Sequence, residues 1–239
     1  MHPDRFRATT APYSAALDQG LRTHMQRVYN RMTFGVLITA LTAWIVSSSP
    51  FLLNLFLNGP QAYVIMFAPV AVLWFGFRPT MSNKQLLSSF IAISVLYGIS
   101  FSVILLAFTG ESIVRAFLVA TIMFAGLSIF GYSTKKNLDA LGTFAVMGVM
   151  GVFALSVFAV IGSLMGMGGL AGLSNIIAGV GILAFAGVTA WQTQSLKEAY
   201  SASMSDDDNS RAAWFGSLTL YISFIAMFQY ILHFIGNRN

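Results

Sequence analysis

The sequence predicts an all-α membrane protein with seven transmembrane helices. Composition, the lengths of the charge-free runs and the placement of Lys and Arg lead to this prediction. Of the 239 residues, 56% are hydrophobic and only 9% are charged, whereas a soluble domain has about 25% charged residues. The mean hydropathy is +0.74. A soluble chain of this length could not bury so much apolar surface, but lipid is as apolar as leucine.

The charge-free runs define the expected spans. A helix needs about 20 apolar residues to cross the hydrocarbon core, and lipid offers its backbone no hydrogen-bond partner. The seven expected spans cover about residues 33–48, 61–77, 87–108, 113–132, 141–165, 174–194 and 213–235. In a six-span alternative, the second of them, with Pro69 at its centre, would be re-entrant.

The segment between the first two spans, SPFLLNLFLNGP, is apolar but interrupted. Its proline, asparagine and glycine residues are typical of turns. We therefore expect residues 49–60 to form an interfacial hairpin.

Lys and Arg placement predicts the orientation, because cytoplasmic loops carry an excess of both. With seven spans, two of these residues, Arg115 and Arg238, lie on one side. The other eleven lie on the opposite side: Arg5, Arg7, Arg22, Arg27, Arg31, Arg78, Lys84, Lys135, Lys136, Lys197 and Arg211. We expect a cytoplasmic amino terminus and an outside carboxyl terminus.

Residues 1–31 are expected to form a cytoplasmic tail, and residues 32–239 the seven-span membrane domain. Apolar residues recur in the tail at a helical spacing, at Leu17, Leu21, Met25, Val28 and Met32. This pattern fits an amphipathic helix on an anionic leaflet. It fits a helical extension of the first span equally well.

Candidate chemistry is scarce. The chain has no cysteine, and His2, His24 and His233 lack ligand spacing. It contains neither G-x-S-x-G nor H-E-x-x-H. We expect no enzymatic activity, cofactor or metal site. The pI near 9.7 reflects a few unbalanced basic loop residues, so we expect no nucleic-acid partner. The DDDN run at residues 206–209 is interpreted as a solvated loop tip, or as a weak cation site.

The compact basic stretch GYSTKKNLDALG, residues 131–142, separates two apolar runs and predicts a cytoplasmic turn. In the following span, Gly142, Gly148 and Gly151 indicate close helix packing. The stretch MGMGGLAG, residues 165–172, is expected to be a flexible outer turn.

Several segments carry a family resemblance: RVYNRMTFGVLITALTAW, GYSTKKNLDALGTFAVMGVMG, TAWQTQSLKEAY and LTLYISFIAMFQYILHFIGNRN. Together they resemble the bacterial branch of the Bax inhibitor-1 (transmembrane Bax inhibitor motif) family, from about Met25 onward. The resemblance implies six spans arranged around a central seventh, and here a location in the bacterial inner (plasma) membrane. It also implies calcium leak, pH response or stress suppression, and for some bacterial members a membrane-bound protease as partner.

The sequence departs from the family at two positions. Calcium-leak members carry aspartates in A-Y-D-T-Q and L-Y-L-D-F, where this chain has Gln192 and Ser223. Two close carboxylates in a low dielectric titrate as a pH sensor, but Gln and Ser do not titrate. These two residues are expected to be either interhelical hydrogen-bonding groups or a modified gate. Arg78 is the best positional match for the family's basic partner of the pair.

Two functions therefore remain open. One is a regulator of membrane homeostasis or of a membrane-bound protease, embedded in the lipid bilayer. The other is a calcium or ion leak channel with altered pH gating.

Overall fold

The described part of the chain folds into a bundle of eight helices. The computed structural model describes residues 4–59, 61–78, 80–165, 171–201 and 203–238. The helices are α1 (Asp4–Ser47), α2 (Pro50–Leu57), α3 (Gln61–Gly76), α4 (Asn83–Ala107), α5 (Gly110–Ser133), α6 (Asp139–Leu164), α7 (Ala171–Ala199) and α8 (Asp206–Ile235). The predicted all-α class is confirmed.

Hydroxyl side chains fix where several helices begin. Ser82 accepts a hydrogen bond from the Gln85 backbone, and the Gln85 side chain accepts one from the Ser82 backbone, which is a capping box. The Thr109 and Ser205 side chains cap α5 and α8 by accepting a hydrogen bond from a backbone N–H in the first turn of each helix. These caps satisfy backbone N–H groups that the first helical turn leaves unpaired.

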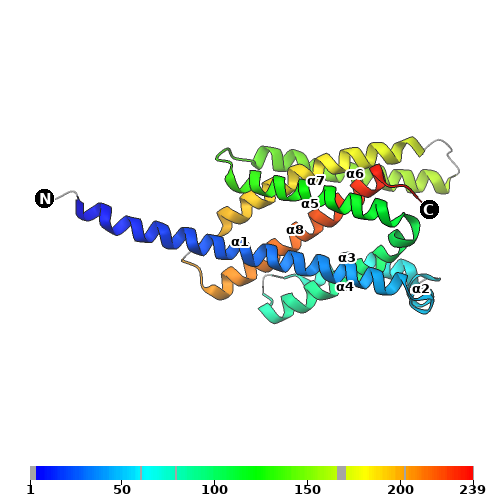
Figure 1. The fold of residues 1–239 in the computed structure, drawn as a ribbon, viewed down its shortest axis with the longest axis horizontal. Coiled ribbons are helices and arrows are strands. Elements are labelled where there is room, and N and C mark those ends of the chain that lie inside the picture. The colour runs from blue at the N-terminus through cyan, green and yellow to red at the C-terminus, as the bar shows by residue number, and fades with distance from the viewer. Residues whose placement is uncertain (1–3, 60, 79, 166–170, 202, 239) are drawn as a thin grey trace.

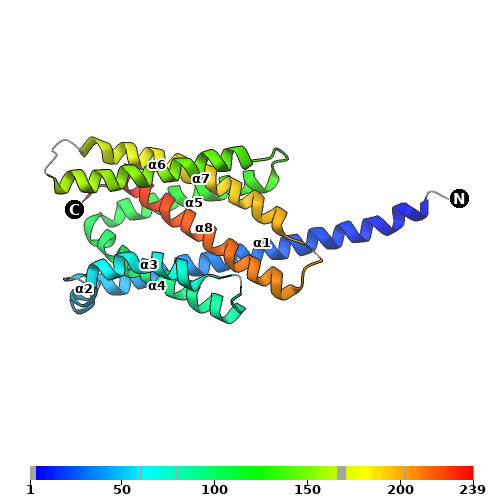
Figure 2. The same ribbon diagram turned by 180° about the vertical axis from the view of Figure 1, so that it is seen from behind.

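Helix α8 lies between two groups of helices (Figures 1 and 2). One group contains α1, α3 and α4, and the other contains α5, α6 and α7. α8 packs against α1, α4, α5 and α7, whereas α3 and α6 pack mainly on α4 and α7. In its most apolar stretch, 56% of α8 is buried, compared with at most 39% in the other candidate spans. α8 is therefore the most buried of the candidate spans.

The helix lengths support five to six membrane spans, compared with the seven that the sequence predicts. Five helices are long and apolar enough, namely α4 to α8. The pair Asp18–Ser47 and Pro50–Leu57, bent by 106°, makes a sixth if it is one span. α3 has only 16 residues, so its length of about 24 Å falls short of a hydrocarbon core of about 30 Å.

The connection before α3 contains a helix where the sequence predicts a hairpin. Pro50 occupies the first turn of α2, and Ser49 caps it. Proline is well tolerated there because the first helical N–H groups have no intrahelical partner. None of the α2 side chains is buried, so α2 lies at the edge of the bundle.

The amino-terminal segment continues the first span without a break, which is the second of the two alternatives for the tail. α1 runs from Asp4 to Ser47, and its amino-terminal part projects beyond the bundle (Figure 1). Met25, Val28 and Met32 are buried between helices. Their apolar spacing thus matches a protein core, and no bilayer surface is needed to explain it.

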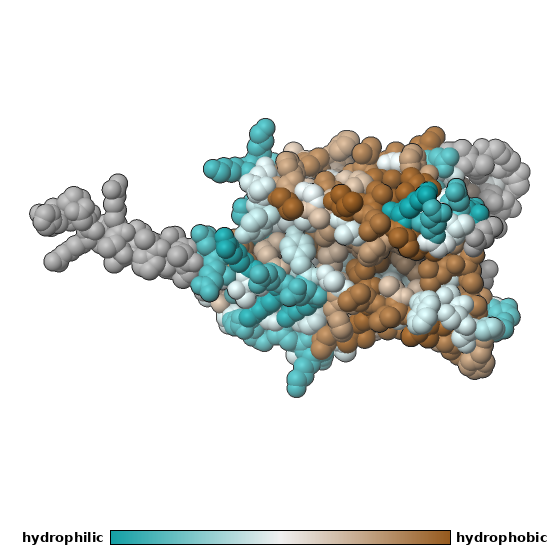
Figure 3. Space-filling model, viewed as in Figure 1, coloured by the Kyte–Doolittle hydropathy of each residue, from teal (hydrophilic) through white to brown (hydrophobic). Residues whose placement is uncertain are grey.

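The bundle surface is apolar between two polar ends (Figure 3). Large side chains such as Ile122, Phe144 and Leu183 are exposed, as expected for a surface that faces lipid. The acidic run expected at a loop tip instead forms the first turn of α8, where carboxylates interact favourably with the helix dipole. The predicted outer glycine turn falls largely on residues 166–170, outside the described residues.

Candidate functional site

Gln192 and Ser223 face each other between α7 and α8. The Ser223 hydroxyl donates a hydrogen bond to Gln192 Oε1 at 2.9 Å. Ser223 is 1% exposed, and it lies about midway along α8. The structure therefore brings together the two positions that the sequence comparison singled out. Neither side chain titrates, so this contact carries no charge that pH could change.

A second set of polar side chains lies where α8 meets α1 and α4. The Thr39 and Tyr221 hydroxyl oxygens are 2.7 Å apart. Thr39 Oγ1 also lies 3.0 Å from the carbonyl oxygens of Gly35 and Ser94. Ser94 in turn donates to the Phe90 carbonyl at 2.9 Å. Hydroxyl groups therefore link three helices inside the apolar core, where an unpaired polar group would be costly.

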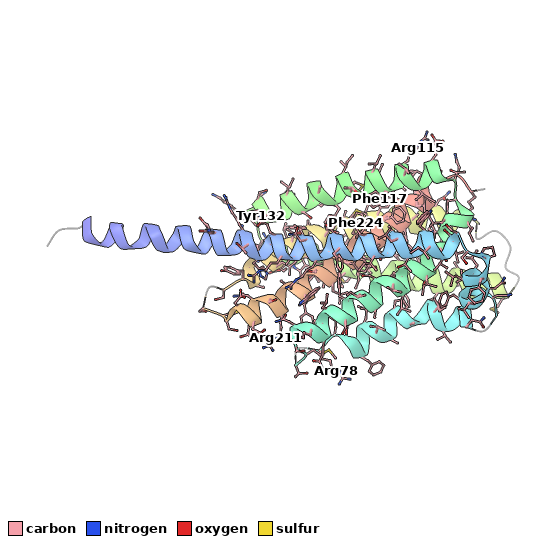
Figure 4. All side chains as sticks on the ribbon, turned by 60° about the horizontal axis from the view of Figure 1, so that its bottom comes forward. Arg78, Arg115, Phe117, Tyr132, Arg211 and Phe224 are labelled. Carbon is pink, nitrogen blue, oxygen red and sulfur yellow. The ribbon has the colours of Figure 1, made fainter. Side chains whose placement is uncertain are left out.

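Arg78 does not join the Gln192–Ser223 pair. It follows α3 in the connection to α4 and is exposed. Figure 4 shows Arg78 well separated from Phe224, the neighbour of Ser223. The structure thus brings together two of the three predicted site residues and leaves the third in the connection between α3 and α4.

One end of the bundle is held together by arginines of α1 and acidic or polar groups at the start of α8. Arg27 pairs with Asp206 at 2.8 Å. The Arg31 guanidinium donates to the carbonyl and the hydroxyl of Ser210 at 2.7 and 2.8 Å, and its carbon lies 4.0 Å from the centroid of the Trp214 ring. A planar guanidinium suits this combination of forked donation and stacking, which a lysine could not reproduce.

The α5–α6 turn that carries the basic signature is clamped by the end of α7. Gln194 accepts from the Leu138 N–H at 2.8 Å and donates to the Lys136 carbonyl at 2.9 Å. Trp191 Nε1 donates to Asp139 at 3.0 Å, and Lys197 Nζ donates to the Tyr132 carbonyl at 2.9 Å. The two resembling segments GYSTKKNLDALG and TAWQTQSLKEAY thus form one structural unit.

Close packing explains the first two of the three predicted glycines. A Cβ on Gly142 would lie 2.2 Å from the Trp191 ring, so the ring covers the backbone of α6 there. A Cβ on Gly148 would lie 3.2 Å from the Ala184 Cβ, which is closer than an ordinary contact, so α6 and α7 also approach closely there. A Cβ on Gly151 would meet nothing within 4 Å, so the packing prediction fails for this glycine.

Sequence analysis missed Thr39, Tyr221 and Gln194. Tyr221 and Gln194 lie within two residues of the family motif positions at Ser223 and Gln192, so the motifs could have drawn attention to them. Thr39 carries no such signal, because a single threonine in an apolar helix commonly bonds to its own helix backbone. Only its position opposite Tyr221 distinguishes it.

The polar side chains described inside the bundle form hydrogen bonds and carry no charge that could bind a cation. The sequence has no Asp or Glu in the middle of any expected span. Within the part of the chain that the structure describes, no three His, Asp or Glu side chains are grouped in a way that could hold a metal ion. Hydroxyl and amide groups like these can fix helix contacts, whereas Ca²⁺ prefers carboxylate and carbonyl oxygens.

Comparison with known proteins extends the likeness over almost the whole chain. The family model described as "Inhibitor of apoptosis-promoting Bax1" matches residues 21–239. An uncharacterized protein of Caulobacter vibrioides is 35% identical, with 93% of this chain and 92% of that protein covered. The uncharacterized protein RP147 of Rickettsia prowazekii is 32% identical over 96% of both chains. The inner membrane protein YbhL of Escherichia coli is 32% identical, with 92% of this chain and 93% of that protein covered.

Proposed function

Because this chain belongs to the Bax inhibitor-1 family of membrane proteins, we propose that it is a non-catalytic regulator in the bacterial inner membrane. It acts by binding another membrane protein, for which a membrane-bound protease is the leading candidate. It does not leak calcium under the control of pH. The relative YbhL is named as an inner membrane protein, which supports this location.

One observation carries the proposal, namely the hydrogen bond from Ser223 to Gln192. It joins α7 to α8 at the positions where the resemblance places the aspartates of calcium-leak members. An aspartate pair would gain or lose a proton and so change the force between the helices. A serine–glutamine pair keeps the same contact at every physiological pH. The contact between membrane helices is worth about 0.6 kcal/mol, a typical value for such bonds.

The chain direction supports a topology with seven crossings. Thr39 of α1 contacts Ser94 of α4, and Gly35 lies against Phe90, so the two helices run parallel. The segment that joins the end of α1 to the start of α4 must therefore return along the bundle. α3 makes this return, as a short span that needs locally thinner lipid.

The basic residues support a cytoplasmic amino terminus. In Figure 4, Arg211 lies towards one end of the bundle and Arg115 towards the other. Contacts of Arg27 and Arg31 with α8 place them at the Arg211 end. Arg238 lies over the Phe108 ring, near the start of α5, at the opposite end. The excess of basic residues at one end is the pattern of a cytoplasmic face.

A partner would find two docking elements on that face. The amino-terminal part of α1 projects from the bundle as a free helix (Figure 2), and basic side chains such as Lys84 and Lys135 are exposed beside it. A regulator that recognises a second membrane protein requires such surfaces, whereas a channel does not.

Calcium flux into liposomes tests the proposal. We expect purified protein to give little flux, with no difference between pH 6 and pH 7.5. The double variant Gln192→Asp with Ser223→Asp should introduce pH dependence, because its carboxylates would share one site. The control Ser223→Ala removes the hydrogen bond without adding a charge, so its calcium flux should stay low at both pH values.

Robust flux through the unaltered protein with a midpoint between pH 6 and 7 would contradict the proposal and favour a leak channel.

A separate experiment tests whether the protein binds a regulatory partner. Crosslinking in native membranes, followed by purification, should recover a membrane-protein partner. Removal of residues 1–16, which precede the bundle, should reduce that recovery. A crosslinked product that contains only this chain would count against a regulator.

A further inference from the structure

An apolar groove runs between α1 and α5. Its wider part, the inner groove, has a volume of about 660 Å³ and includes Met25, Tyr29, Thr121, Ala125, Ser128 and Phe224 in its lining. A second groove of about 350 Å³ continues towards Trp44 and shares Val36, Phe117 and Phe224 with the first. Figure 4 shows Tyr132 towards the Arg211 end and Phe117 towards the Arg115 end, so the inner groove lies on the cytoplasmic side in the proposed topology.

The groove exists because α1 and α5 both pack against α8 and make little contact with each other. Phe224 of α8 forms its floor, and the Phe117 ring packs against that floor at a centroid distance of 5.8 Å. On α5, residues 121, 125 and 128 line the hollow and are all small. They recur at helical spacing, so one stripe of α5 is set back from its neighbours.

Two polar features mark the cytoplasmic part of the inner groove. Arg22 lines its mouth and makes no ion pair with any of the described residues. Ser128 is 6% exposed, and its hydroxyl has no hydrogen-bond partner among the described residues. Ser128 lies five residues before Ser133, which also lines the mouth. The helical rise places it about 7.5 Å deeper in the membrane.

We propose that the inner groove binds one acyl chain of an anionic diacyl phospholipid from the cytoplasmic leaflet. The phosphate lies beside Arg22, and a glycerol ester oxygen accepts a hydrogen bond from Ser128. Arg22 supplies the charge that an anionic headgroup requires. From Arg22 to Val36 the groove extends for about 21 Å at the helical rise. The length of the groove exceeds half the thickness of a hydrocarbon core of about 30 Å, so an acyl chain from one leaflet fits within the groove.

Lipid retention tests the proposal. The protein is placed in nanodiscs with equal amounts of phosphatidylglycerol and phosphatidylethanolamine of the same acyl chains, then washed in mild detergent. Bound lipid is counted by mass spectrometry. We expect about one phospholipid per protein, with phosphatidylglycerol several-fold in excess. Ala125→Phe fills the groove and should reduce both lipids several-fold. Arg22→Gln should bring the ratio of the two lipids close to one.

Two matched variants control for general effects. Ala154→Phe adds the same ring to an exposed position on α6, and Lys84→Gln removes one exposed positive charge on α4. Both should retain lipid as the unaltered protein does. Equal lipid retention by Ala125→Phe and Ala154→Phe would overturn the proposal.

A photoreactive benzoyl-phenylalanine in place of Ala125 gives an independent readout in native membranes. We expect a crosslink to phospholipid. A crosslink to a polypeptide would overturn the proposal and identify the groove as a protein-docking surface instead.

Discussion

The Thr39 hydroxyl of α1 lies 2.7 Å from the Tyr221 hydroxyl of α8, in the most buried part of the bundle. Tyr221 also packs edge-on against Phe90 and Tyr97 of α4. A single side chain of α8 thus contacts two other helices, α1 and α4. The aromatic ring of Tyr221 packs against α4. Its hydroxyl fixes the rotation of α8 relative to α1, because only one rotation brings the two oxygens together.

Tyr221→Phe and Thr39→Val should differ in cost. Tyr221→Phe leaves Thr39 with its carbonyl partners, so we expect a loss of about 1 kcal/mol of unfolding free energy. Thr39→Val leaves the buried Tyr221 hydroxyl without that partner, which costs about 1–3 kcal/mol. Reversible unfolding in mixed micelles measures both. If Tyr221→Phe proved the more damaging variant, the hydroxyl contact would not be what holds the register.

Gly142→Ala should destabilise the contact between α6 and α7. The new Cβ would lie 2.2 Å from Trp191, so the ring must move away and weaken its bond to Asp139. We expect a loss of about 1–3 kcal/mol, typical of overpacking. Gly151→Ala is the matched control on the same helix. Nothing lies within 4 Å there, and alanine favours a helix by up to about 1 kcal/mol. Thermal melting of both variants separates the two effects.

Gln194→Ala should loosen the α5–α6 turn. The side chain bonds both Leu138 N–H and the Lys136 carbonyl, and the buried N–H would lose its partner. Trypsin should then cut after Lys135 or Lys136 several-fold faster, while the melting temperature changes little. Ser195→Ala, which removes a bond to the backbone of its own helix, should leave the cutting rate unchanged. Equal rates of trypsin cleavage in the two variants would contradict the conclusion that Gln194 holds the α5–α6 turn in place.

His24→Phe should be neutral or stabilising. His24 is 3% exposed, and neither ring nitrogen has a hydrogen-bond partner among the described residues. Its ring lies 5.4 Å from that of Tyr200, a contact that phenylalanine can keep. Replacing an unpaired buried polar group by an apolar one of similar shape removes a desolvation cost. Melting at pH 8, where histidine is neutral, measures the change. A loss above about 1 kcal/mol would show that His24 has a polar partner.

Sequence reasoning located the spans more reliably than the contacts between them. The ranges expected for 87–108, 113–132 and 213–235 fall within α4, α5 and α8, apart from one or two residues at the ends. Hydropathy and capping residues are local, so they could be predicted. The expected range 61–77 also matches α3 to within one residue, although the 16 residues of this helix are fewer than the usual length of a span. The tail pattern of Met25, Val28 and Met32 was ambiguous because a core and a bilayer surface select the same apolar spacing.

By itself, the sequence determined that this is a helical membrane protein and to which family it belongs, because apolar length and motif order are properties of each segment. The family resemblance implies that Gln192 and Ser223 stand where calcium-leak members carry titrating residues. Only the tertiary structure decided that these two side chains bond to each other, that Arg78 lies apart from them, and that α1 and α5 leave a groove over α8. Lipid is equally apolar on every side of a helix. The faces that meet are therefore chosen by close packing and buried hydrogen bonds, which no single segment specifies.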